Sequence, residues 1–467
     1  MFNLSNLFKK NSDVFLQRDE IAKMLKTSPE KLAEFEKYYQ TQVLPNLEPD
    51  ANNMFNVNAK QAAAMTSNKE ISNEEINTLI HRIVAELSAQ TSTYVYDGKI
   101  ATITSPNELG DDARPVTLDD ITALPAELRP QLSGSLMKSD MPAASHMLLW
   151  YLDAMQKTNN PAKKQDMYHH FRQGLDIMDL DGLTYEMIGM NTNSMGHWLP
   201  QLVEANTDKD FFKIPKTVIT KVPLTLLQLT HTEYAEITST TKAIVNQWAM
   251  ATFGLETDKD YFIKTGTYSS KFDFRNCHVN DPKEITEIGE YLLYIHFSAL
   301  QMASPLNKPC IYGVSTTNEW VVREYIPDKE NNPIIYKGLP LHTEYRVFID
   351  CDDNTVLDCV PYWDPDVMKK RFEENRDGHD IHDYISYKAH EETLMKRFDD
   401  NKNIIMAKVA ELLPDLDLKG QWSLDIMQNG DDFWLIDMAL AELSAGYTKA
   451  VPIEKRRPSK ENWLPEL

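Results

Sequence analysis

Residues 421–440, "QWSLDIMQNGDDFWLIDMAL", decide the fold that we expect for this chain. Two strand-like apolar runs flank "QNGDD", whose composition is typical of a hairpin turn. The stretch therefore predicts two neighbouring strands, with Asp425 on the first and Asp437 on the second. Facing carboxylates on paired strands repel each other unless a cation bridges them. Mg²⁺ is held by one or two carboxylates together with phosphate oxygens, so both are candidate magnesium ligands, and Glu442 is a third.

Basic residues occupy strand-like runs upstream of this hairpin. The stretch "FIKTGTYSSKFDF" (262–274) places Lys264 on a strand and Lys271 at the far side of a small polar loop, and Arg323 lies within "EWVVREYI" (319–326). A charged residue in a strand usually points to solvent, and this is the simpler interpretation for any one of them. As a set, two lysines and an arginine could neutralise a polyphosphate.

The end of the run 319–326 is a candidate site for reading a nucleobase. The strand ends in Glu324, Tyr325 and Ile326 and is followed by Pro327 and Asp328. A strand that stops at a proline leaves backbone groups free to bind an adenine edge. Asp328 or Glu324 could then bind ribose hydroxyls.

The order of these pieces resembles the ATP-grasp fold. It runs from a strand lysine and a Ser-rich loop with a second lysine to a strand ending "REYI", an "EYRVF" strand and "SLDI…G…FWLIDM". The resemblance covers roughly residues 210–450 and is closest to the small branch that includes the cell-division-cycle translation-factor assembly chaperones and related phage and bacterial proteins. It implies an α+β fold in which two subdomains clamp ATP.

The resemblance also implies roles for individual residues. Lys264 would contact the α- or β-phosphate, and Lys271, in a lid loop over residues 266–272, would contact the terminal phosphates. Arg346 would bind a phosphate or the acceptor group. The remaining implied ligands are Arg323, Glu324, Tyr325, Ile326 and Asp328 for the nucleotide, and Asp425, Asp437 and Glu442 for Mg²⁺.

One position departs from the family pattern. Many ATP-grasp proteins end the last strand with an acid, one spacer and an Asn that completes the metal site, whereas this chain has Asp437, Met438 and Ala439. Glu442 could substitute for the Asn. Without a substitute, the second metal ion would be missing, which puts catalysis in doubt, while nucleotide binding could survive.

Three functions follow as hypotheses. The first is an ADP-forming ligase that joins a small-molecule or peptide carboxylate to an amine through an acyl-phosphate. The second is an ATP-binding assembly factor with little turnover, whose protein partner docks on the N-terminal half. The third is nucleotidyl transfer to a nucleic-acid end.

Composition and patterning bound these hypotheses. A formal net charge of −22 disfavours an extended nucleic-acid surface. The chain shows neither a signal-peptide pattern nor an apolar run of about 18 residues, so we expect a cytoplasmic protein without a membrane span. We expect a helical hairpin over 1–46, a mixed helical region over 47–195, the nucleotide-binding domain over 196–450 and a tail over 451–467.

Overall fold

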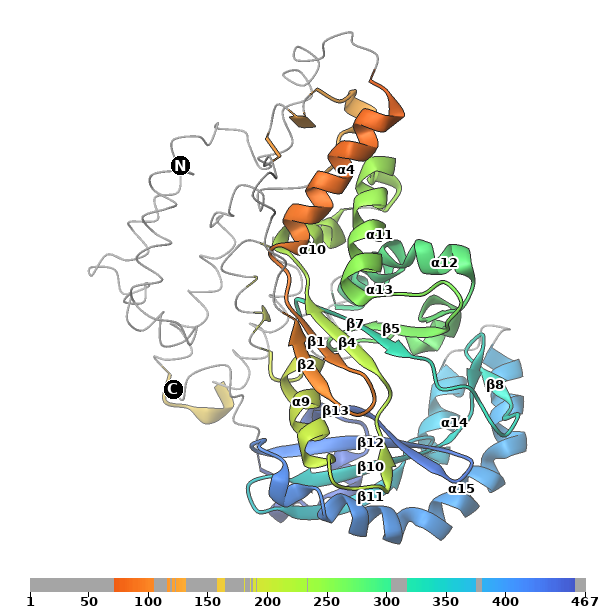
Figure 1. The fold of residues 1–467 in the computed structure, drawn as a ribbon. Coiled ribbons are helices and arrows are strands. Elements are labelled where there is room, and N and C mark those ends of the chain that lie inside the picture. The colour runs from red at the N-terminus through yellow and green to blue at the C-terminus, as the bar shows by residue number, and fades with distance from the viewer. Residues whose placement is uncertain are drawn as a thin grey trace.

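A computed structural model describes residues 71–104, 191–303 except 233, 317–374 and 380–457, with shorter pieces between 116 and 189. The hairpin expected over 1–46, most of the region 105–190 and residues 458–467 lie outside the described residues. The principal helices are α4 (Asn73–Ser88), α9 (Met195–Ala205), α11 (Ser239–Phe253), α12 (Pro282–Thr286), α13 (Ile288–Ala303), α14 (Pro365–Glu374) and α15 (Asp380–Ala410) (Figure 1). No helix among these described parts is long and apolar enough to cross a membrane.

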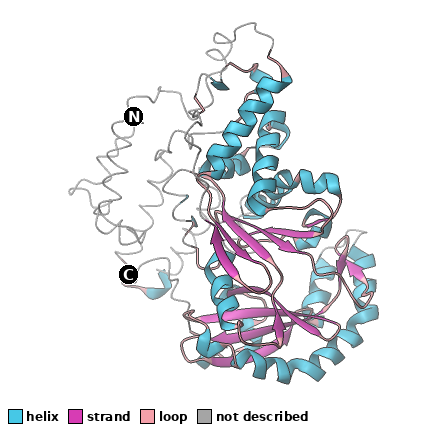
Figure 2. Ribbon diagram, viewed as in Figure 1, coloured by secondary structure: helices cyan, strands magenta, loops and turns pink. Residues whose placement is uncertain are grey.

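The described strands form two large sheets, in which most neighbouring strands are antiparallel (Figure 2). The first has the order β2-β1-β4-β7-β5-β6, and the second has the order β11-β10-β12-β13-β3. The strands of the first sheet are β1 (Thr93–Tyr96), β2 (Ala101–Thr104), β4 (Thr217–Lys221), β5 (Tyr261–Thr265), β6 (His278–Val279) and β7 (Glu319–Glu324). Those of the second are β3 (Phe212–Lys213), β10 (Thr343–Asp350), β11 (Thr355–Pro361), β12 (Gln421–Asn429) and β13 (Asp432–Leu440). The expectation of an α+β fold is confirmed.

Helices cover one face of the first sheet. Helix α11 packs between α4 and α13, and its buried Trp248 lies edge-on to Trp320 of β7, with ring centroids 5.8 Å apart. Helix α4 begins at a capping box between Ser72 and Glu75, which satisfies backbone N–H groups at the helix start. Helix α11 ends at Gly254, whose φ of +60° favours glycine. The sequence predicts both boundaries, since Ser72 is typical of a helix N-cap and Gly254 of a helix end.

The second sheet packs its apolar face against α15 and α9. Leu424 of β12 and Val347 of β10 belong to the same buried cluster as Ile405 of α15 and Leu202 of α9. Helix α9 also contacts β4 and β7, so it lies between the two sheets. Because side chains alternate along a strand, the opposite face of β10, β12 and β13 carries the polar residues.

Three details differ from the sequence predictions. The pattern of residues 284–302 predicts one helix, but the structure has two, α12 and α13, with Glu287 between them. The aromatic run at the end of 262–274 forms a 3₁₀ helix, Lys271–Asn276, because Phe274 turns into the core instead of alternating along a strand. Strand β1 pairs with β4, so residues 93–104 extend the same sheet as the region 196–450 and the expected boundary at 195 does not separate them.

Part of the expected tail is also integrated into the fold. Val451 is buried, and Arg457 pairs with Asp350 at 3.4 Å and with Asp353. The described residues 451–457 therefore pack on the second sheet's end.

Candidate functional site

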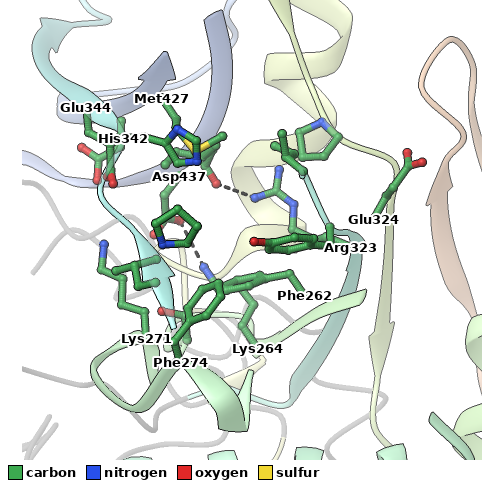
Figure 3. A pocket seen from close by; sticks show the side chains of 18 residues that line it. Phe262, Lys264, Lys271, Phe274, Arg323, Glu324, His342, Glu344, Met427 and Asp437 are labelled. Carbon is green, nitrogen blue, oxygen red and sulfur yellow. Dashed lines mark hydrogen bonds and ion pairs between the residues drawn. The ribbon is translucent and has the colours of Figure 1, made fainter. Parts of the chain in front are cut away.

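A pocket lies between the two sheets, where the polar face of one meets that of the other (Figure 3). The space between its lining atoms amounts to about 830 Å³, open solvent at its mouth included. The lining residues are Pro215, Phe262, Lys264, Ser269, Lys271, Phe274, Arg323, Glu324, Tyr325, Ile326, Leu339, Pro340, His342, Glu344, Asp425, Met427, Ile436 and Asp437.

Strand register explains why the first sheet delivers basic groups to this pocket. Lys264 of β5 is the cross-strand partner of Val321, and Phe262 is the partner of Arg323 on β7. Residues two apart share a face, so Phe262, Lys264 and Arg323 all project to the side away from α11. The structure therefore brings Lys264 and Arg323 together, as the sequence predicted.

Lys264 is almost fully buried and reaches across to the second sheet. Its Nζ lies 3.2 Å from Oδ1 of Asp437, whose side chain is 44% exposed. Burial lowers the pKa of Lys264, and the charge of Asp437 opposes that shift. A buried lysine ammonium with one carboxylate partner has further N–H donors with which it can bind a second anion.

Arg323 is 5% exposed and is positioned by two hydrogen bonds. Its Nε donates to Thr217 Oγ1 at 3.1 Å, and its Nη1 donates to the carbonyl of Ile436 at 2.5 Å. That carbonyl is available because β13 carries a bulge: Asp437 pairs with Asp425 and Leu435 with Ile426, which leaves Ile436 between them. Among the described residues Nη2 of Arg323 has no hydrogen-bond partner, and burial lowers the pKa of Arg323 to about 10 against the opposing charge of Asp437.

A row of three charged residues crosses the second sheet. Arg346 on β10 pairs in register with Asp425 on β12, which pairs with Asp437 on β13. Arg346 donates from Nε to Oδ1 of Asp425 at 2.8 Å and from Nη2 to Oδ2 at 2.7 Å. This bidentate geometry commits both oxygens of Asp425, and the third nitrogen, Nη1, donates to the carbonyl of Ala445 at 3.3 Å.

Lys271 and Glu344 form the other end of the pocket. Nζ of Lys271 lies 4.0 Å from the centre of the Tyr362 ring. Burial lowers the pKa of Lys271, but Tyr362, Glu344 and Asp425 together outweigh it and raise the pKa above its ordinary value. Glu344 is 7% exposed, and burial raises its pKa to about 7 although Lys271 opposes the shift.

The loop that was expected to act as a lid is anchored at its first half. Gly266 donates its N–H to the carbonyl of Glu319 at 3.0 Å and accepts from the N–H of Met195 at 2.9 Å. A Cβ at Gly266 would lie 2.7 Å from Thr317 Oγ1 and 2.8 Å from Glu319 Oε2, so this close approach requires glycine. Tyr268 is buried in the first core, and only the part from Ser269 to Lys271 faces the pocket.

The strand end that was expected to bind adenine, residues 324–326, lines the pocket, but two of its backbone N–H groups already form hydrogen bonds within the protein. Glu324 and Tyr325 donate their N–H groups to the carbonyls of Lys216 and Asp260, at 2.9 and 3.1 Å. These two donors are therefore not free, contrary to the expectation, while the side chains of Glu324, Tyr325 and Ile326 do line the pocket.

Two predicted ligands lie outside the lining. Asp328 accepts from the N–H of Glu330 at 3.1 Å and from that of Asn332 at 2.6 Å, so it shapes its own loop. Those hydrogen bonds lower the pKa of Asp328 although burial acts in the opposite direction. Glu442 is exposed on a short 3₁₀ helix, Ala441–Leu443, beyond the end of β13.

The three predicted magnesium ligands differ in how far their oxygens are already engaged. No group of three or more His, Cys, Asp or Glu side chains with metal-binding geometry occurs in the part of the chain that the structure describes. Asp425 is held by Arg346 through both oxygens, whereas Asp437 uses Oδ1 for both Lys264 and the N–H of Met438. Asp437 fits the role of a metal ligand that shares the ion with phosphate oxygens.

Several pocket residues were not assigned a role from sequence. Glu344 stands among the charged strand residues of the sequence, but no motif marks it out. Phe262, Phe274 and Met427 supply apolar walls, and Trp363 fixes Glu344 by donating from Nε1 to Oε1 at 3.1 Å. Strand alternation from Arg346 and from Asp425 would have placed Glu344 and Met427 on the same face.

Comparisons with known proteins give limited information. A scan of protein-family models and a search of curated proteins both found no match. Among solved structures, C-terminally truncated Cdc123 from Schizosaccharomyces pombe aligns with a TM-score of 0.32 and 13% identity, over 59% of this chain and 95% of its own. Cdc123 from Schizosaccharomyces pombe aligns with a TM-score of 0.30 and 13% identity, over 57% and 94%. Superpositions at this level do not establish a shared fold, so the ATP-grasp assignment remains a prediction from the sequence motifs.

Proposed function

We propose that the inter-sheet pocket binds ATP together with Mg²⁺ and activates its γ-phosphate for transfer. The observation that carries the proposal is the convergence of Lys264, Lys271 and Arg323, from β5, the 3₁₀ helix and β7, on one pocket. The buried Arg323 nitrogen that has no partner among the described residues supports it, because a phosphate oxygen would satisfy that donor.

The walls of the pocket suit the rest of a nucleotide. Phe262, Phe274, Ile326, Leu339 and Met427 supply apolar surface beside the cations. A planar base packs well between apolar and aromatic side chains, while the phosphates need the charged end. An apolar slot next to a set of lysines and an arginine is the combination that a nucleoside triphosphate requires.

The charge balance of the lining explains the need for a divalent ion. Three lining residues are cations (Lys264, Lys271, Arg323) and four are carboxylates (Glu324, Glu344, Asp425, Asp437). The lining therefore has no net positive charge with which to neutralise a triphosphate that binds without a metal ion. A magnesium ion held by Asp437 and the phosphates would supply the missing positive charge and polarise the γ-phosphate.

Calorimetry and product analysis test the proposal. Purified protein titrated with ATP, ADP and AMP, each with and without Mg²⁺, should bind ATP–Mg²⁺ most tightly. Nucleotides separated after incubation with ATP and Mg²⁺, with and without cell extract, should show ADP and phosphate. AMP and pyrophosphate would instead indicate nucleotidyl transfer, and absence of ATP binding would refute the proposal.

A second candidate is a protein that binds ATP without turning it over. It is favoured by the bidentate pair of Arg346 and Asp425, which leaves Asp437 as the available carboxylate, and by Ala439 in place of the usual Asn. In that case bound ATP would stabilise the contact between the two sheets, and a protein partner would bind the ATP-bound conformation. Tight binding with no product in extract would select this candidate over transfer and over the carboxylate–amine ligase.

A further inference from the structure

Glu344 lies at the end of the pocket where the last phosphate of a bound nucleotide would meet an acceptor. Figure 3 shows Lys271 and Glu344 on one side of the pocket, Arg323 and Glu324 on the opposite side, and Lys264 between them. Glu324, at the end of the strand proposed to bind the base, thus lies across the pocket from Glu344. Under the proposed function, on which this inference rests, the group that attacks ATP approaches at the Lys271 end.

The two carboxyl oxygens of Glu344 differ in their hydrogen bonding. Oε1 accepts from Trp363 Nε1 at 3.1 Å, whereas Oε2 is buried and has no hydrogen-bond partner among the described residues. A buried acceptor without a donor destabilises a fold by about 1–3 kcal/mol, so such an atom calls for an explanation. A ligand that brings a donor hydrogen to Oε2 is one.

The charged groups that face Glu344 restrict the chemistry of that ligand. They are Lys271 from the 3₁₀ helix, Asp425 from β12 and Arg346 from β10, with Tyr362 stacked against Lys271. The guanidinium of Arg346 is held by Asp425 and the carbonyl of Ala445, and Asp425 balances its charge. Oε2 of Glu344 needs a donor hydrogen, which a deprotonated carboxylate acceptor lacks and a hydroxyl supplies.

We propose that Glu344 accepts the hydrogen bond, and then the proton, of an alcohol hydroxyl that attacks the γ-phosphorus of ATP. The alcohol oxygen forms a bond to the γ-phosphorus, and the bond from that phosphorus to the bridging oxygen of the β-phosphate breaks. ADP leaves with the electron pair, and the proton of the alcohol stays on Glu344. The substrate class is thus an alcohol, in place of the carboxylate expected from the sequence resemblance.

The acid–base properties of the site agree with this role. Burial raises the pKa of Glu344 to about 7, Asp425 adds to the shift, and Lys271 and Arg346 limit it. A general base works best when its pKa lies near the operating pH. Lys271, a cation at the same end of the pocket, would stabilise the charge that develops on the transferred phosphoryl group.

The experiment uses the full-length protein with γ-labelled ATP, Mg²⁺ and simple acceptor probes. Glycerol serves as the alcohol, water as the background acceptor, and acetate with hydroxylamine traps any acyl-phosphate as a hydroxamate. We expect labelled glycerol phosphate without hydroxamate, and about a 10²-fold loss of transfer in Glu344→Gln. We also expect the wild-type rate to rise with pH up to about pH 7 and to level off above it, a rise that Glu344→Gln should lack.

Matched variants separate catalysis from folding. Glu392→Gln makes the same chemical change at an exposed position of α15 and should leave both transfer and its pH profile unchanged. If Glu344→Gln does not fold, Glu344→Asp keeps the carboxylate and should retain the pH-dependent rise at a reduced rate. Hydroxamate formation, transfer at the wild-type rate in Glu344→Gln, or ATP binding without transfer to glycerol or water would overturn the inference. Loss of ATP binding in the wild-type calorimetry would instead refute the proposed function itself.

Discussion

Asp425 and Asp437 stand directly opposite each other on β12 and β13, yet a different cation neutralises each of them. Arg346, in the same row of the sheet, holds both oxygens of Asp425 at 2.7 and 2.8 Å. Lys264 reaches Asp437 from the other sheet, at 3.2 Å. Neutralisation by two cations removes the repulsion that such a pair would otherwise suffer, so the fold does not need a metal ion to tolerate it. The first pair joins strands within a sheet, whereas the second spans the pocket and is the one that a nucleotide can reach.

Lys264→Met should weaken ATP binding. Nζ of Lys264 is a buried charge-assisted donor at the centre of the pocket, and such a hydrogen bond contributes about 1.5–3 kcal/mol. We expect a 10- to 100-fold higher Kd for ATP–Mg²⁺ in calorimetry. Lys259→Met is the control, because Lys259 pairs with Glu256 on the surface just before β5. Equal affinity in the two variants would remove Lys264 from the phosphate site.

Arg346→Met should destabilise the protein. Asp425 is 6% exposed and would lose both of its side-chain hydrogen bonds, which leaves a buried carboxylate unpaired. Breaking a buried ion pair in this way costs about 3–5 kcal/mol, measurable as a lower free energy of unfolding in urea. The double variant Arg346→Met/Asp425→Leu should recover most of the loss, because no unpaired charge remains. A single variant within about 0.5 kcal/mol of the wild type would show that the pair is not stabilised as the geometry indicates.

Asp437→Asn should remove the magnesium dependence of ATP binding. Asp437 is a lining carboxylate with an oxygen available to a metal ion, since its contacts to Lys264 and Met438 both use Oδ1. We expect the ratio of ATP affinities with and without Mg²⁺ to fall to about 1 in the variant. Asp415→Asn, at an exposed site that pairs with Lys209, should keep the wild-type ratio. A wild-type ratio in Asp437→Asn would place the metal ion elsewhere.

Glu344→Gln should change how stability depends on pH. Burial raises the pKa of Glu344 from 4.5 to about 7 in the folded state, so between these values the folded chain holds a proton that the unfolded chain has lost. The stability of the wild type relative to the variant is therefore highest below about pH 4.5 and falls as the pH rises through about 7.

Glutamine resembles the protonated side chain and does not titrate. The unfolding free energies of wild type and Glu344→Gln should accordingly differ least near pH 4.5, with the variant gaining up to about 3 kcal/mol relative to the wild type above pH 7. Chemical denaturation across this pH range provides the measurement. Parallel curves for the two proteins would show that Glu344 has an ordinary pKa in the folded state.

Local sequence patterns were sufficient for most of the secondary structure. The capping box at Ser72, the Asp-Gly turn at Gly98 and the glycine at 254 each fix a boundary by short-range chemistry. The break at Glu287 was missed, because both halves of 284–302 have a helical composition and only their packing separates them. The place of β1 beside β4 was missed as well, since strand pairing over more than a hundred residues leaves no local signal.

The order of the motifs along the chain carried the prediction of the site further than alternation along any single strand. Lys264, Arg323 and Asp437, which that order named, all lie among the lining residues. The order failed for Asp328 and Glu442, which lie in loops whose direction is set by their own hydrogen bonds and by the turn after β13.

The sequence by itself determined the strands, their polar faces and the residue types that a nucleotide site needs, because period-two alternation and turn composition are local properties. Only the tertiary structure decided which charges meet. The register of β10 on β12 assigns Arg346 to Asp425, and the packing of the two sheets brings Lys264 to Asp437. The bulge at Ile436 turns a backbone carbonyl toward Arg323. Such pairings depend on distances between segments far apart in the chain, and burial of Glu344 between those segments sets its pKa.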